Sequence, residues 1–206
     1  KAYAIVGVST DITERKRGEQ RLRAQFERLN LLDRTTRAIG ERQDLRSIFQ
    51  VAIGSPEEHL PIDFGCIGLY ERANQTIEIT GIGTRSHSLA LELGLLGHAC
   101  LKIDANGLGR CVRGQLVHEP DIAGSTFPFP AQLARGGLRA LVIAPLSVEN
   151  EVFGVLIAAR RVPAGFASTD CEFLRQLSEH LALAAHQAQL FASLQQAYHD
   201  LRRTQQ

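Results

Sequence analysis

The 206-residue sequence has no Met, no Trp and few cysteines. Its four cysteines lie far apart in the chain and form no C-x-x-C pair, which argues against a zinc ribbon and a thioredoxin-like motif. We therefore expect reduced, partly buried thiols, as in a cytoplasmic protein. The absence of Met, together with a chain that starts at Lys1, leads us to expect a piece of a longer protein. The cysteines are Cys66, Cys100, Cys111 and Cys171.

The chain also lacks a strong charge of either sign and lacks long apolar runs. Its formal net charge is +1, with 44% hydrophobic and 22% charged residues, which is ordinary for a globular domain. This balance does not favour nucleic acid or an anionic membrane as a partner. No apolar run approaches the ~20 residues of a membrane helix, and the first residues lack the pattern of a signal peptide. We expect a cytoplasmic location, with no membrane and no nucleic-acid partner.

Phosphate-binding motifs are missing as well. Gly107 and Gly109 are followed by Arg110, but neither G-x-x-x-x-G-K-[ST] nor G-x-G-x-x-G is present. We interpret these glycines as a turn that leads into a short helix.

Hydrophobic spacing predicts a long helix from Ile12 onward. Leu22, Phe26, Leu29 and Leu32 recur at intervals of four, three and three residues. This stripe is narrow, which is typical of a seam between two helices.

A second helix is expected shortly after Gly40. Asp44 is a suitable N-cap residue, because its carboxylate can accept a hydrogen bond from an amide of the first turn. Pro56 and Pro61 are expected to end this helical region.

Two hairpins are predicted from β-rich runs separated by short polar turns. The first joins residues 64–70 to residues 76–82, and the second joins residues 141–148 to residues 152–159. The second is almost continuously apolar, which indicates a central and largely buried position. Pro145 lacks an amide hydrogen, so we expect it at an edge or a bulge. Between the hairpins we expect loops, with a short strand at 116–118.

Residues 168–206 are predicted to form one helix, because Ser168-Thr169-Asp170 is a good start signal and no Pro or Gly follows. Its apolar spacing contains a stammer, a local overwinding of a coiled coil, near Ala188 to Leu194. Neither long helix can bury its stripe alone, so we expect a parallel homodimer through both. The residues expected at the dimer seam are Leu22, Phe26, Leu29, Leu174, Leu177, Leu181, Phe191, Leu194 and Tyr198.

The two ends of the chain resemble parts of bacterial sensor proteins. GVSTDITERKRGEQRLR (7–23) resembles the end of a PAS domain, and SLQQAYHDLRRTQQ (193–206) resembles the connector before the dimerisation helix of a sensor histidine kinase. The second resemblance implies that the phosphorylated His lies beyond Gln206. The chain itself is then expected to have no enzymatic activity.

The body resembles a GAF domain over residues 44–190. FGCIGLYE (64–71), NGLGRCVRGQLVHEPDI (106–122), APLSVENEVFGVLIAAR (144–160) and FASTDCEFLRQLSEHLALA (166–184) follow one another in the order found in that family. The resemblance implies an α+β fold of the GAF (PAS-like) type. Its central antiparallel sheet has about five or six strands flanked by helices, with long coiled-coil helices at both ends.

The resemblances divide the chain into four parts and imply a function. The function is that of a sensory, signal-transmitting GAF module of a two-component sensor histidine kinase. Such a module is expected to relay a small-molecule or upstream signal through paired helices, with its own PAS and kinase domains as partners. No cofactor is required by the sequence. The parts are 1–14, the tail of an upstream PAS domain; 15–43, a signalling helix; 44–190, the GAF domain; and 191–206, a coiled-coil connector.

An enzymatic alternative comes from the segment Ala99 to Ile103 together with Cys111. It looks like the active-site stretch of GAF-fold enzymes that reduce free methionine sulfoxide, in which a thiolate attacks the sulfoxide. The chain departs from that family, because the catalytic Cys aligns near Leu133.

A bilin sensor, a heme sensor and a ligand-free spacer that only dimerises are also compatible with the sequence. His98-x-Cys100 is similar to the His and Cys of bilin-binding GAF domains, but in the reverse order. His118 is a candidate heme ligand, although a lone His is more often a surface residue. The cyclic-nucleotide signature N-K-x-x-F-x-x-x-D-E is absent.

The GAF resemblance places a ligand pocket between the sheet and the layer of loops and helices, here residues 111–139. Arg139 would meet an anion there. The alternative is that the apolar side chains simply fill this space. The pocket candidates are Cys111, His118, Phe127, Phe129, Leu133 and Arg139.

Overall fold

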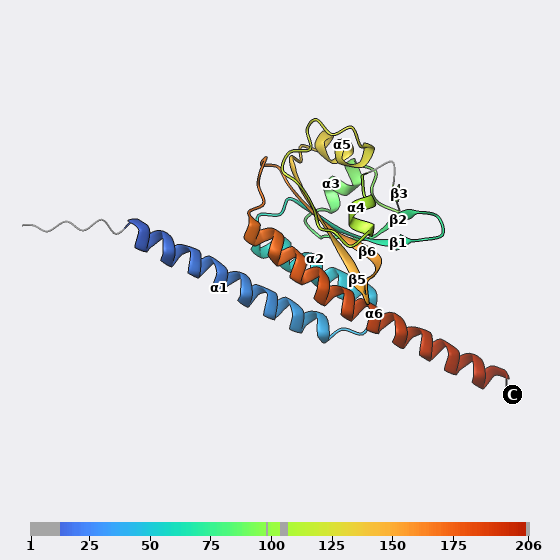
Figure 1. The fold of residues 1–206 in the computed structure, drawn as a ribbon. Coiled ribbons are helices and arrows are strands. Elements are labelled where there is room, and N and C mark those ends of the chain that lie inside the picture. Colours follow the sequence, from blue (N-terminus) through green and yellow to red (C-terminus); the bar gives the residue numbers. More distant parts are fainter. Residues whose placement is uncertain (1–12, 98, 104–106, 205–206) are drawn as a thin grey trace, which may run out of the picture.

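The computed structural model describes residues 13–97, 99–103 and 107–204 (Figure 1). Most of the expected PAS tail, and His98, therefore lie outside the described residues. The helices are α1 (Thr13–Gly40), α2 (Leu45–His59), α3 (His87–Glu92), α4 (Gly109–Val112), α5 (Pro128–Arg135) and α6 (Ser168–Thr204). The strands are β1 (Phe64–Glu71), β2 (Thr76–Ile82), β3 (Cys100–Lys102), β4 (Val117–Glu119), β5 (Ala140–Val148) and β6 (Glu151–Arg160).

The strands form one antiparallel sheet of six strands in the order β3-β2-β1-β6-β5-β4. Both predicted hairpins are confirmed, and β6 lies at the centre with β1 and β5 beside it. The turn between β5 and β6 has Glu149 and Asn150 at φ 52° and 66°. Positive φ at both central residues is the geometry of a tight type I′ hairpin turn.

Pro145 lies in β5 at a place where one side of the strand is open. The neighbouring strand β4 pairs only with Leu141, Val142 and Ile143, so it ends before Pro145 is reached. A register shift follows at Leu146/Ser147. The expectation of an edge or bulge position is confirmed, because β4 does not extend to Pro145 and a register shift follows close by.

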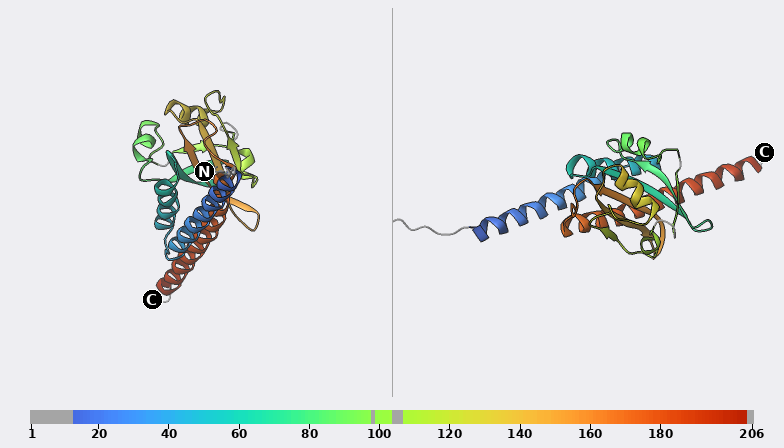
Figure 2. Two further views of the ribbon diagram at one scale, coloured as in Figure 1. Left: turned by 90° about the vertical axis from the view of Figure 1, so that its left-hand side faces the viewer. Right: turned by 90° about the horizontal axis from the view of Figure 1, so that it is seen from above.

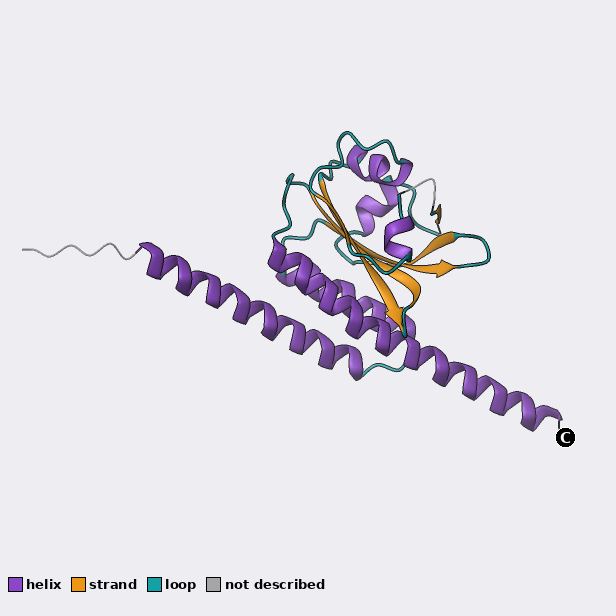
Figure 3. Cartoon of the chain, in the orientation of Figure 1, coloured by secondary structure: helices purple, strands orange, loops and turns teal. Residues whose placement is uncertain are grey.

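Helices cover both faces of the sheet (Figures 1 and 3). One apolar cluster joins α1, α2 and α6 to one face, and a second joins α3, α4 and α5 to the other. Successive side chains of a strand point to opposite faces. In β5, Val142 and Ala144 therefore belong to the first cluster, and Leu141 and Ile143 to the second. This explains why the central hairpin is apolar at nearly every position.

The two long helices lie side by side in the body and project from it in opposite directions (Figure 2). In α1, Leu31, Thr35 and Ile39 are buried, whereas residues 13–27 are all exposed. In α6, the last buried residue for which burial is described is Ala188. One part of each helix thus packs in the domain, and the other part projects from it as an arm.

The structure corrects part of the predicted dimer seam. Leu174, Leu177 and Leu181 are at most 1% exposed, and they pack in the apolar cluster between α6 and the sheet. The same three-four spacing serves a coiled coil and a helix on a sheet, so the sequence pattern alone did not separate them. These leucines are core residues of this chain.

The end of α2 also differs from the prediction. Pro56 lies inside the helix, which continues to His59. Proline removes one helical hydrogen bond, but the turn that contains Glu57 makes contacts with another segment of the chain. The buried carboxylate of Glu57 accepts hydrogen bonds from the Ser86 hydroxyl and from the Arg85 amide. These contacts tie the last turn of α2 to the segment before α3.

Candidate functional site

A cavity of about 650 Å³ opens between the β4–β5 side of the sheet and the layer formed by α4 and the segment that leads to α5. Its floor is apolar, because β4 and β5 turn Val117, Leu141 and Ile143 toward it. Ile103 and Ile122 continue this apolar surface. The remaining lining residues are Gly107, Gly109, Arg110, Arg113, Glu119, Asp121, Gly124, Ser125, Thr126, Phe127 and Pro130.

One wall is formed where the Phe127 ring lies against Gly107. Gly107 has φ +69°, and a Cβ atom at this position would come within 2.8 Å of the ring. Glycine adopts this conformation without strain, and only glycine lets the ring approach so closely. The two residues thereby join the turn before α4 to the start of α5.

Two ion pairs lie at the rim of the cavity. Nη2 of Arg110 is 2.9 Å from Oε1 of Glu119. The guanidinium of Arg139 donates two hydrogen bonds to Asp121, of 2.9 and 2.7 Å. This Arg139 contact, assisted by the Ala123 amide, lowers the pKa of Asp121 to about 2. Both rim carboxylates are therefore already paired with an arginine.

The side chain of a third rim arginine, Arg113, makes no hydrogen bond or ion pair within the described part of the chain. Its guanidinium lies over α4, since a Cβ atom on Gly109 would be 3.4 Å from Nη1 of Arg113. Among the described lining residues it carries the one positive charge without a partner. The cavity thus combines an apolar floor with an available guanidinium.

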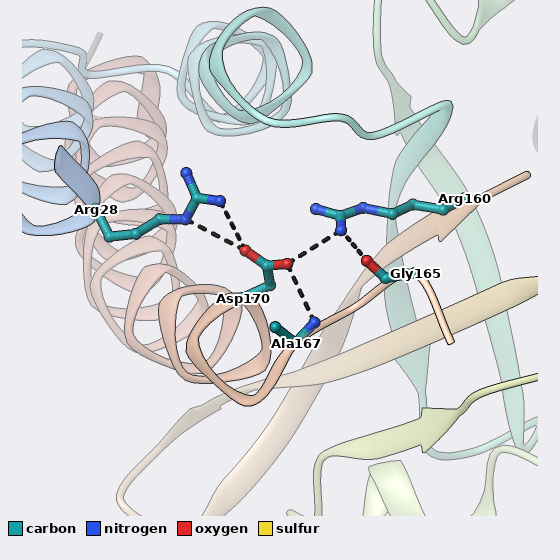
Figure 4. A network of polar contacts seen from close by, with 5 residues as sticks. All are labelled: Arg28, Arg160, Gly165, Ala167 and Asp170. Carbon is teal, nitrogen blue, oxygen red and sulfur yellow. Dashed lines mark hydrogen bonds and ion pairs between the residues drawn. The ribbon is translucent and has the colours of Figure 1, made fainter. Parts of the chain in front are cut away.

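A second functional feature lies on the other side of the sheet, where α1, β6 and α6 meet (Figure 4). Oδ1 of Asp170 accepts hydrogen bonds of 3.2 and 2.9 Å from Nε and Nη2 of Arg28 on α1. Its Oδ2 accepts from Nη1 of Arg160 at the end of β6, at 3.0 Å, and from the Ala167 amide, at 3.2 Å. One carboxylate therefore links three segments of the chain.

Asp170 and Arg160 are only 4% and 6% exposed, so this is a buried ion pair. Arg160 also donates to the Gly165 carbonyl, and its guanidinium lies 4.3 Å above the centre of the Phe166 ring. Its Nε and Nη2 find no hydrogen-bond partner among the described residues. The contact with the aromatic face partly compensates the buried charge.

A family comparison decides what kind of domain holds these features. The family model described as "GAF domain" matches residues 42–186, which is more than half of the chain. The chain belongs to the GAF domain family. Its sheet of six antiparallel strands, flanked by helices with α1 and α6 as long terminal helices, is a GAF fold.

This GAF domain is similar to part of a circadian histidine kinase. It is 26% identical over 175 residues to the circadian input-output histidine kinase CikA of Thermosynechococcus vestitus, a match that covers 81% of this chain and 24% of the relative. The chain thus spans a quarter or less of the length of the curated relatives it matches. No helix in the described part of the chain is long and apolar enough to cross a membrane.

Solved structures with the same fold have diverse roles. The GAF domain of a phosphoenolpyruvate-protein phosphotransferase from Coxiella burnetii has a TM-score of 0.70 at 16% identity, covering 82% of this chain and 98% of that one. A free methionine-R-sulfoxide reductase from Neisseria meningitidis, solved with its substrate, has a TM-score of 0.66 at 14% identity, covering 92% and 99%. At such identities the likeness shows the fold alone.

Of the six predicted pocket residues, Phe127 lines the cavity of this GAF domain. Cys111, Phe129 and Leu133 are fully buried in the apolar cluster behind it. They fill space, as the alternative interpretation expected. His118 does not line the cavity. Side chains alternate along β4, so His118 points away from the cavity and toward Phe166, with ring centres 6.5 Å apart. The side of β4 on which His118 lies could not be deduced from a single His in the sequence.

Arg139 is close to the cavity but does not line it. Its guanidinium is bound to Asp121, so it orients a rim carboxylate and does not face the interior. The residues that the sequence prediction missed are Arg110, Arg113, Glu119 and Asp121. The signal was available in part, because Arg110 and Arg113 are three residues apart at α4 and so lie on one side of it.

The Cys111 thiol does not have the properties that a sulfoxide reductase needs in its nucleophile. Cys111 is buried, its Sγ lies 3.8 Å from the Ile143 carbonyl, and burial raises its pKa to about 12. It is a neutral thiol at neutral pH, whereas the thiolate is the nucleophile. Leu133 occupies the aligned catalytic position and is fully buried. Within the described part of the chain, no group of His, Cys, Asp or Glu could hold a metal ion.

Proposed function

We propose that this chain is the signal-transmitting GAF module of a two-component sensor histidine kinase. It carries a signal from the cavity, and from an upstream PAS domain, along α1 and α6 to the kinase domain. The similarity to CikA supports the class of protein. In this proposal residues 1–14, 15–43, 44–190 and 191–206 are the PAS tail, the signalling helix, the GAF domain and the connector.

The observation that carries the proposal is the junction at Asp170. The first turn of α6 is bound to α1 through Arg28 and to the central strand β6 through Arg160. α6 then runs without interruption for 37 residues and leaves the body at its far end. A shift of β6 or α1 therefore acts on the start of a single helix that ends outside the domain.

Pairing with a second copy is part of the proposal. On the surfaces that the core leaves uncovered, α1 exposes Leu22, Phe26 and Leu29, and α6 exposes Phe191, Leu194 and Tyr198. Burying each Leu or Phe side chain would contribute about 1.5–3 kcal/mol. We propose that these arms pair in parallel in a homodimer, and that signalling is a population shift between two packings of the pairs.

The variant Arg28→Gln tests the proposal in the full-length kinase. It removes the contact between α1 and Asp170 but leaves the buried pair of Asp170 with Arg160 in place, so the domain is expected to stay folded. We expect autophosphorylation to change, because α1 no longer acts on the start of α6. The matched control is Arg23→Gln, which breaks an exposed i,i+4 pair with Glu27 on the same helix. Equal output from both variants and the wild type would refute the relay.

A further inference from the structure

We infer that the cavity takes a small amphipathic organic anion, with its acidic group on Arg113 and its apolar body on the floor of β4 and β5. This rests on the proposed function of the cavity as the sensory site. The carboxylate, sulfonate or phosphate of such a ligand supplies the negative charge that pairs with the guanidinium of Arg113. The inference follows from the charges of the rim, the position of Arg113 and the shape of the floor.

The rim charges select against a cationic ligand. Glu119 and Asp121 are the acidic residues among the described lining residues, and each is paired with an arginine. A cationic ligand would have to break one of these pairs. An anion meets Arg113 without displacing any described contact, and Arg110 lies three residues away at the same rim. A guanidinium binds a planar or tetrahedral oxyanion through two parallel hydrogen bonds.

The floor selects an apolar body. Val117, Leu141 and Ile143 are at most 3% exposed, yet they line the cavity. The Phe127 ring forms a flat wall beside them and is 44% exposed. A volume of about 650 Å³ lies within the range of pockets for small organic ligands. An inorganic anion would leave the exposed Phe127 ring uncovered.

The absence of Trp allows a direct test by fluorescence. The probe is 1-anilinonaphthalene-8-sulfonate, and its neutral analogue N-phenyl-1-naphthylamine lacks the sulfonate. We expect saturable binding of the sulfonate at one site per chain, at least about tenfold tighter than the neutral analogue, since a hydrogen-bonded charge contributes about this much. Equal affinities of the two probes would overturn the inference.

Two further measurements locate the bound probe. Arg113→Gln should weaken the sulfonate about tenfold and the neutral analogue little, while Arg135→Gln, outside the cavity, should change neither. A single Trp introduced as Thr126→Trp at the rim should transfer excitation to the bound sulfonate more strongly than Leu190→Trp on α6. Unchanged binding in the Arg113 variant, or stronger transfer from position 190, would contradict the inference. Neither result bears on the phosphorylation assay, so failure of the relay and failure of this site are distinguishable.

Discussion

At the scale of single residues, the molecule depends on charges that are buried or paired across long sequence distances. Asp170 and Arg28 are 142 positions apart in the chain but make two hydrogen bonds. From the sequence, Asp170 was predicted only as part of a helix start, which it is. Its link to α1 and β6 was not predictable from local patterns, because it exists only once the sheet has brought β6 and α6 together.

Asp170→Asn should destabilise the domain by about 3–5 kcal/mol, because it leaves the buried guanidinium of Arg160 without its counter-charge. Urea unfolding followed by circular dichroism measures this. Glu179→Gln is the matched control on the same helix, since it alters an exposed pair with Arg175 and should cost less than about 1 kcal/mol. A similar cost for both variants would mean that the buried pair is unimportant.

The rim carboxylate Asp121 should titrate at about pH 2, below its ordinary value of 3.8. Since the pKa is lowered in the folded state, the pair with Arg139 stabilises the protein above about pH 4, and this contribution is lost as the pH falls toward 2. A carbon-detected NMR titration of the carboxyl group measures the value. In Arg139→Gln it should rise toward 3.8, and no rise would show that Arg139 does not cause the shift.

The buried thiol of Cys111 should be inert in the folded protein. Its pKa of about 12 keeps it protonated, and the side chain is fully buried. Cys100 is exposed, so iodoacetamide at pH 7.5 should label it, and mass spectrometry should find no label on Cys111 until the protein is unfolded. Rapid labelling of Cys111 in the native state would show that this thiol is accessible and reactive, and would favour the enzymatic alternative.

At the scale of elements, hydrophobic period predicted the long segments, and local signals also indicated the short α4 and β4, but α3 and α5 were missed. Both hairpins, α1 and α6 were found, because each repeats its pattern over many residues. The helices α3 and α5 have six and eight residues and were not predicted. Pro128 and Pro130 make the start of α5 resemble a loop, although proline fits the first turn of a helix.

The element scale also separates the two roles of α6. Leu177→Ala should destabilise the domain by about 2–5 kcal/mol, because it opens a cavity between α6 and the sheet. Leu183→Ala, on the same helix but 52% exposed, should cost well under 1 kcal/mol. Chemical denaturation of the two variants compares them. If Leu177 proved as tolerant as Leu183, it would belong to an interface and not to the core.

At the scale of the whole molecule, what the sequence predicted well is the arrangement of a body with an arm at each end. The sequence could not assign each apolar residue to the body or to an arm, because the same three-four spacing of apolar residues occurs in both. The structure makes this division at about Ala188. Where burial is described, the buried residues of α6 lie at or before it, whereas Phe191, Leu194 and Tyr198 beyond it are 48%, 69% and 55% exposed.

If the arms pair as proposed, Leu194→Glu combined with Tyr198→Glu should shift the chain from the proposed dimer to a monomer without unfolding it. Both side chains are more than half exposed, at 69% and 55%, so the domain itself loses little. Size-exclusion chromatography with light scattering gives the mass, and Gln196→Glu on the opposite side of the helix is the control. A double variant that stays dimeric would place the interface elsewhere.

The central claim, that α6 transmits a signal as one helix, is tested most directly by insertions after Ala192 in the full-length kinase. One inserted residue turns everything beyond it by about 100°, whereas seven residues restore the facing side to within about 20°. Autophosphorylation is the measurement. We predict that the single insertion alters the output and its response to signal, and that the seven-residue insertion largely restores both. Output that is the same in both variants and in the wild type would contradict the account.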